Sequence, residues 1–101
     1  MPHTAVHPGE LLAGHLSDLA MSAAELGRQL KVPANRITEI LNKQRAITGD
    51  TPLRLGHFFG TSPEYWLNLQ AAYEVYLAEQ KVGPNIKRLP TLRMCKKKAL
   101  G

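Results

Sequence analysis

Apolar residues recur with helical spacing in two short segments between residues 22 and 42. The recurring positions are Leu26 and Leu30 in the first segment and Ile37, Ile40 and Leu41 in the second. Residues three or four positions apart fall on one face of a helix, so each segment is predicted to be an amphipathic helix. Between them Val32 and Pro33 break the pattern, because proline disfavours a helical conformation in the preceding residue and readily starts a new helix. The pattern therefore predicts two short helices joined by a tight turn.

Single residues around these segments indicate how the two helices begin and meet. Ser22 and Glu25 have the spacing of a capping box, and Gly27 falls where the helices would cross closely. Such a pair of helices is typical of the helix-turn-helix motif, whose second helix enters the major groove of DNA; an ordinary helical hairpin is the alternative. Lys31 departs from the motif, which often has a glycine with positive φ at that position. A lysine there either costs about 1 kcal/mol or indicates a slightly different turn.

A helix is also predicted on either side of this pair. The first opens at Pro8, Gly9 and Glu10, after an N-terminus that is expected to be loosely attached up to Val6. Its expected buried stripe is Leu11, Leu12, Leu16 and Leu19. The fourth begins after Thr48 or, with the clearer signal, at Thr51 before Pro52, and Gly60 ends it. Its expected apolar face is Leu53, Leu55, Phe58 and Phe59.

The fifth predicted helix is longer and aromatic. Ser62 caps it with Pro63 at the first helical position, and Gly83 and Pro84 are expected to end it. No segment alternates with a period of two residues, so strands are not predicted. The fold class is therefore all-α, with five helices and one domain over residues 1–84, followed by a basic, irregular and mobile tail over residues 85–101.

The net charge of +5 is distributed unevenly along the chain. Six of the thirteen Lys and Arg residues are Lys87, Arg88, Arg93, Lys96, Lys97 and Lys98, and all eight acids precede them. Residues 1–86 therefore carry seven positive and eight negative charges, a net charge of −1. Since the body is close to neutral, DNA binding has to depend on where its cations lie, whether or not the tail helps.

Several classes of function are not predicted. Cys95 is the single cysteine, which excludes an internal disulfide and fits a reducing cytoplasm. No run of about 20 apolar residues and no signal-peptide pattern is present, so neither a membrane span nor export is expected. The four histidines are His3, His7, His15 and His57. His3 and His7 lie four apart but next to Pro8, without other clustered ligands, so no metal is expected. We recognise no catalytic motif and expect neither enzyme activity nor a cofactor.

Three stretches resemble a known family. They are HPGELL from His7, VPANRITEILNKQRAIT from Val32 and LRLGHFFGTSPEYWLNLQAAYEV from Leu53. Together, over roughly residues 7–82, they are similar to the HigA addiction-module antidotes, which are related to virulence-associated protein I within the lambda-repressor-like helix-turn-helix class. The resemblance implies a five-helix antitoxin that neutralises a RelE-like ribonuclease toxin and, as a dimer, represses their shared promoter.

The motif assigns the expected DNA contacts. The first turns of its second helix face the bases, which makes Ala34, Asn35, Arg36, Thr38 and Glu39 the candidate base-reading residues. Glu39 is expected to need a cationic partner, either Arg36 or Lys43. The candidate phosphate contacts are Ser22, Ala23, Arg28, Lys43, Arg45 and Thr48. The expected DNA is a palindromic double-stranded operator.

The aromatic fifth helix is the candidate dimer interface, through Trp66, Leu69, Tyr73 and Tyr76, with Trp66 in the core as the other possibility. Two other functions remain open. One is a stand-alone repressor without a toxin partner. The other is an adaptor whose motif serves only protein–protein contact, which the nearly neutral body favours.

Overall fold

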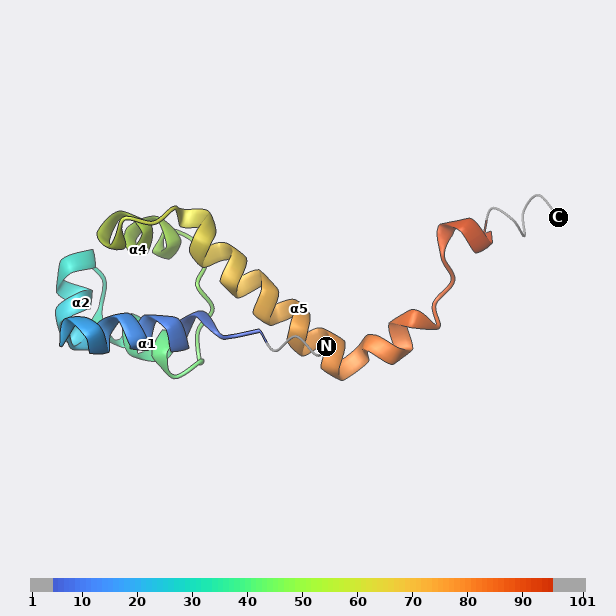
Figure 1. Cartoon of the computed structure of the whole chain (residues 1–101), viewed down its shortest axis with the longest axis horizontal. Helices are drawn as coiled ribbons and strands as arrows, with labels where there is room; N and C mark the ends of the chain where they lie inside the picture. Colours follow the sequence, from blue (N-terminus) through green and yellow to red (C-terminus); the bar gives the residue numbers. More distant parts are fainter. Residues whose placement is uncertain (1–4, 96–101) are drawn as a thin grey trace.

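The computed structural model describes residues 5–95, and in this range the chain is helical without any strand. The helices are α1 (Pro8–Leu19), α2 (Ala23–Leu30), α3 (Ala34–Leu41), α4 (Thr51–Phe59) and α5 (Pro63–Lys87). The first four and the start of α5 form a compact body, from which the rest of α5 projects (Figure 1). The all-α, five-helix prediction is confirmed.

The core lies between α1, the α2–α3 pair, α4 and the start of α5. Its buried apolar residues are Leu12, Leu16, Leu26, Leu30, Ile37, Ile40, Ile47, Leu55 and Trp66. Most of these are the positions that recur at helical spacing in the sequence, and burying each such side chain contributes about 1.5–3 kcal/mol.

Two leucines that were expected in the core lie on the surface. Leu53 is 60% exposed, because it lies two residues from the buried Leu55 and therefore on nearly the opposite side of α4. Leu19 is 53% exposed, because it is the last residue of α1, where the chain turns away at Ala20.

The starts of the helices follow the sequence signals with one difference. Proline occupies one of the first two positions of α1, α4 and α5, as proline prefers. The expected cap of α4 at Thr51 is wrong by one residue, since Asp50 takes the N-cap position and Thr51 and Pro52 are the first helical residues, both buried.

The predicted end of α5 at Gly83 and Pro84 is wrong. The helix continues through both residues to Lys87, and the chain changes direction in this orange part of the ribbon (Figure 1). Proline removes one backbone hydrogen bond and bends a helix, but here the side chains around it face solvent, so neighbouring helices do not resist the bend.

The tail is also less irregular than predicted where it is described. A helical turn forms at residues 92–95, and the Thr91 hydroxyl accepts a hydrogen bond from the Met94 amide at 3.2 Å. Of the tail cations, Lys96, Lys97 and Lys98 lie outside the described residues, as does His3 at the other end of the chain.

Candidate nucleic-acid interface

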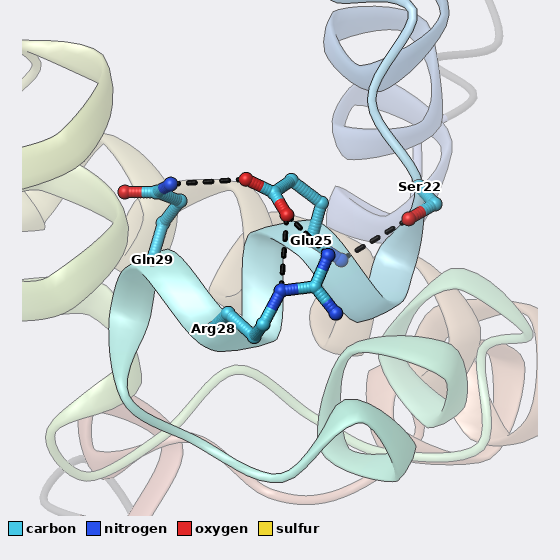
Figure 2. Close-up of polar contacts among 4 residues, drawn as sticks. All are labelled: Ser22, Glu25, Arg28 and Gln29. Carbon is cyan, nitrogen blue, oxygen red and sulfur yellow. Dashed lines mark hydrogen bonds and ion pairs between the residues drawn. The ribbon is translucent and has the colours of Figure 1, made fainter.

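The start of α2 is held by Ser22. Its hydroxyl accepts a hydrogen bond from the Glu25 amide at 3.1 Å, as expected for the first half of a capping box (Figure 2). The Glu25 carboxylate does not return to the cap; it accepts from Gln29 at 3.0 Å and from Arg28 instead. These hydrogen bonds, first from Gln29 and then from Arg28, lower the pKa of Glu25 below its usual value. Arg28 therefore lies beside a carboxylate on the exposed side of α2.

The turn between α2 and α3 has the geometry of the helix-turn-helix motif. Lys31 has φ 61° and ψ 43°, the left-handed conformation that the motif usually gives to glycine. A Cβ atom on Gly27 would lie 3.0 Å from the Val32 carbonyl oxygen and 3.2 Å from the Cα of Ala34. Such distances are tight for a carbon contact, so the close approach predicted at Gly27 is confirmed.

Helix α3 presents the residues that were expected to read bases. Ala34, Asn35 and Thr38 are exposed, and Arg36 and Glu39 are half-buried. Thr38 donates its hydroxyl to the Ala34 carbonyl at 3.2 Å. The opposite side of the helix anchors it, because Ile37 and Ile40 are fully buried and Leu41 is half-buried. The assignment of the isoleucines to the core is confirmed.

The cations of α3 and of the segment that follows it are paired with carboxylates. Arg36 Nη1 lies 3.5 Å from Asp50 Oδ1, and Arg45 Nε donates to Glu39 Oε1 at 2.8 Å. Lys43 pairs with Glu10 of α1. The expected partners of Glu39, Arg36 or Lys43, are therefore wrong. The chain turns sharply after α3, with Lys43 at φ 61°, and this turn brings Arg45 back to Glu39.

Arg54 is a structural residue that sequence reasoning missed. Its guanidinium donates to the Leu30 carbonyl at 2.7 Å and to Asp50 Oδ2 at 2.7 Å, which fastens α4 to the end of α2. The hydrogen bond from Arg54 is the main reason why the pKa of Asp50 lies below its usual value. The Asp50–Arg54 spacing of four residues could have indicated the pair, but the bond to Leu30 depends on the tertiary fold.

The candidate phosphate contacts lie at two places in the chain. Ser22, Ala23 and Arg28 belong to the start and middle of α2, and Lys43, Arg45 and Thr48 to the segment that follows α3. All are exposed except Ala23, which is half-buried. Their contact with DNA stays a prediction.

A second missed residue, Gln70, positions the segment after α3. Its side-chain oxygen accepts from the Ile47 amide at 2.9 Å, while Ile47 itself is fully buried. This bond joins the segment that carries Arg45 and Thr48 to α5. The only signal in the sequence is a glutamine among the apolar residues of the fifth predicted helix.

The four candidate interface residues lie mostly inward. Trp66 is fully buried in one chain, where its indole Nε1 donates to Thr61 Oγ1 at 2.9 Å, so the core possibility holds and it offers no surface to a second copy. Leu69, Tyr73 and Tyr76 are half-buried. Tyr73 packs edge-on against His7, with ring centroids 4.8 Å apart.

Within residues 5–95 there is no group of three or more His, Cys, Asp or Glu side chains that could hold a metal ion. None of the helices in this range is long and apolar enough to cross a membrane.

Comparison with known proteins gives consistent matches, although no family model matches the chain. Virulence-associated protein I of Dichelobacter nodosus is 47% identical over 77 residues, which are 75% of this chain and 71% of the relative. The solved addiction module antidote protein of the HigA family from Coxiella burnetii has a TM-score of 0.85 and 51% identity, covering 88% of this chain and 98% of that one.

A third match was solved together with DNA. The Pseudomonas aeruginosa antitoxin HigA with higBA promoter has a TM-score of 0.82 and 38% identity, covering 87% of this chain and 98% of that one. The resemblance read from three stretches of sequence thus extends to nearly whole solved chains. With these identities, this coverage and the helix-turn-helix of α2 and α3, the chain belongs to the HigA family of helix-turn-helix addiction-module antidote proteins.

Proposed function

We propose that this chain is a DNA-binding antitoxin that represses its own promoter through α3. One observation carries the proposal: a polar, exposed start of α3 on a fold that a 38% identical antitoxin shares, and that antitoxin was solved with promoter DNA. The protein acts by binding and has no catalytic role.

Each candidate base-reading residue of α3 has a chemical task in the proposal. The Asn35 amide can pair with the major-groove edge of adenine, and Glu39 can accept a hydrogen bond from cytosine. Arg36 lies at the rim, where it can reach a guanine or a phosphate. Ala34 and Thr38 provide the small apolar contacts that fit a thymine methyl group.

The test compares two duplexes, the chain's own promoter and a random sequence of equal length. Asn35→Ala should lose about 1–3 kcal/mol on the promoter and little on the random duplex. Lys43→Ala should weaken binding to both, because phosphate contacts carry no sequence information. Equal binding of the wild-type protein to both duplexes at moderate salt would contradict sequence-specific repression and favour the adaptor.

We also propose that the repressor binds as a symmetric dimer to half-sites about one helical turn apart. The surface for the second copy is the outward stripe of α5, whose exposed residues Ala71, Val75, Ala78 and Val82 recur every three or four positions. Val75 is 56% exposed and Val82 is 37% exposed, so the described part of the chain leaves both side chains open to a second copy. The stripe replaces Trp66 in the interface, and it lies on the other side of α5 from Tyr73, which packs against His7.

The charges beside this stripe fit an antiparallel pair of α5 helices. Ala71 of each copy then faces Val82 of the other, and Val75 faces Ala78. The same register brings Glu74 of each copy to Lys81 of the other, which favours pairing of opposite charges at coiled-coil flanking positions.

A charge exchange tests this register. Glu74→Lys or Lys81→Glu should weaken the dimer in analytical ultracentrifugation, and the double variant should restore it. The matched control is Glu79→Lys. In the same register this acid lies nearest the uncharged Ala72 of the other copy, so reversing its charge breaks no ion pair between the copies. Failure of the double variant to recover would rule out the register.

For the protein partner, we propose a small RelE-like ribonuclease toxin encoded beside this gene. Family membership supports an antitoxin role, and a gene for a small basic protein next to this one would support a toxin. Co-expression should protect cells from that protein. If the neighbouring product is neither toxic nor bound, the stand-alone repressor is the correct reading.

A further inference from the structure

All ion pairs within residues 5–95 have their cation in α2, in α3, in the segment after α3, or in α4. The pairs are Arg28–Glu25, Arg36–Asp50, Lys43–Glu10, Arg45–Glu39 and Arg54–Asp50. Four of these five cations are the ones proposed to contact phosphates or bases. The candidate DNA surface thus carries its own carboxylate partners.

These carboxylates use the same hydrogen-bonding groups that a phosphate would need. Arg45 donates through Nε to Glu39 at 2.8 Å, and Arg28 donates through Nε to Glu25 at 3.0 Å. A guanidinium or ammonium group binds carboxylate and phosphate oxygens in the same way. A phosphate must therefore displace the carboxylate or share the cation with it.

The pairs are placed where such an exchange can occur. The side chains of the paired cations Arg28, Arg36, Lys43 and Arg45 are 30–69% exposed, so solvent and DNA can reach them. Exposed ion pairs are weak, and a polyanion can compete for them. Hydrogen bonds from their partners lower the pKa of Glu25 and of Asp50 below the usual values, and both carboxylates are charged at neutral pH.

The folded body as a whole is close to electrically neutral, as its ion pairs are. Residues 1–86 have a net charge of −1, so no general positive field draws this part of the chain toward DNA. Non-specific DNA binding depends almost entirely on phosphate contacts, which these carboxylates oppose.

We propose that Glu10, Glu25, Glu39 and Asp50 are intramolecular counter-ions that set the DNA affinity by occupying the phosphate-binding cations in the free protein. DNA binding then exchanges these carboxylates for phosphates. This inference rests on the proposed DNA-binding function and adds the residues that limit it.

The decisive variant is Glu10→Gln, because this change frees Lys43 from its ion pair and Glu10 is not itself a proposed DNA contact. Its matched control is Glu64→Gln: both acids are exposed, both lie in the first turn of a helix, and both changes add one positive charge. Asp50→Asn forms a second arm, with the exposed Asp18→Asn as its control, and asparagine serves equally well at the N-cap of α4.

Binding of the full chain is measured on promoter and random duplexes over a range of salt concentrations, with thermal melts to verify folding. Glu10→Gln and Asp50→Asn should tighten binding to both duplexes about two- to fivefold, the worth of an exposed ion pair, and steepen the salt dependence. The controls should change affinity less than twofold.

Equal effects of Glu10→Gln and Glu64→Gln, or weaker binding by Glu10→Gln, would overturn the inference while leaving the proposed function intact. Absence of any promoter binding by the wild-type protein would overturn both.

Discussion

At the scale of single residues, two glycines of α1 differ in the space that a side chain would have. A Cβ atom on Gly9 would overlap the carbonyl oxygen of Ile40, where the start of α1 crosses the end of α3. A Cβ atom on Gly14, five residues further along the same helix, would meet nothing within 4 Å. Only Gly9 is therefore required by packing.

Alanine at these two positions should change stability in opposite directions. Gly9→Ala should destabilise the fold by about 1–3 kcal/mol, because the obstacle is backbone and cannot rotate away. Gly14→Ala should stabilise it by about 0.5–1 kcal/mol, since alanine favours a helix interior. Urea midpoints measure both. A neutral Gly9→Ala would mean that α1 does not approach α3 as closely as described.

His7 is a buried cap that has to be neutral. It is 3% exposed, and its Nδ1 accepts the Gly9 amide hydrogen bond at 2.8 Å, which a protonated imidazole cannot do. Burial, then the charge of Lys43, lowers the pKa of His7 below its usual 6.5, although Glu10 opposes the shift. Tyr73 is the aromatic neighbour from α5.

The free energy of unfolding should therefore depend on pH through His7. Because the folded pKa lies below the unfolded one, the unfolded chain binds more protons between the two values. The contribution of neutral His7 is complete above pH 6.5 and is lost as the pH falls from there toward the folded pKa. Thermal melts from pH 5 to 8 should show this loss in the wild-type protein. His7→Asn keeps a capping oxygen without titrating, so an identical slope in that variant would contradict the assignment.

At the scale of elements, the turn of the helix-turn-helix offers a substitution that should stabilise the fold. Lys31 ends α2 in the left-handed conformation, where a side chain is strained and glycine is not. Lys31→Gly should therefore raise stability by up to about 1 kcal/mol, less the extra entropy that glycine gives the unfolded chain. The control is Ala24→Gly, an exposed helical position of α2 where glycine should cost about 1 kcal/mol. Destabilisation by Lys31→Gly in chemical denaturation would show that the lysine makes a contact that outweighs its strain.

Hydrophobic periodicity was enough to predict the core positions and the start of a helix where these depend on residues nearby in the sequence. Ile37 and Ile40 could be assigned to the core because they share one face of a short helix, and Ser22 could be assigned as a cap. The end of α5 could not, because whether Pro84 ends or merely bends a helix depends on what surrounds it.

The polar contacts of the candidate site were harder still to foresee. Arg45 reaches Glu39 only because the chain turns at Lys43, and Lys43 reaches Glu10 from another helix. Pairs between separate elements leave no periodic signal. Candidate DNA contacts could thus be proposed from the sequence, whereas the carboxylates paired with their cations could not.

At the scale of the whole molecule, most of the positive charge lies apart from α3, the helix proposed to read DNA. The described chain extends over 64 Å in its longest direction, and its C-terminal part leads away from the body that holds α3 (Figure 1). The body is nearly neutral, and the basic residues gather after residue 86. The two parts should therefore contribute differently to binding: the body gives sequence preference, and the tail gives salt-dependent attraction.

Removing the last residues should reveal this division. Truncation after Leu89 leaves α5 intact and removes Arg93, Lys96, Lys97 and Lys98, which lowers the net charge from +5 to +1. If the tail contacts DNA, the slope of log affinity against log salt should flatten by up to about 0.9 per lost phosphate contact, while preference for the promoter survives. A full-length variant with the same four residues changed to glutamine separates charge from length and should behave like the truncation. An unchanged slope in both proteins would show that these cations do not bind DNA. An acidic surface on the proposed toxin would then be the partner to test with the same two variants.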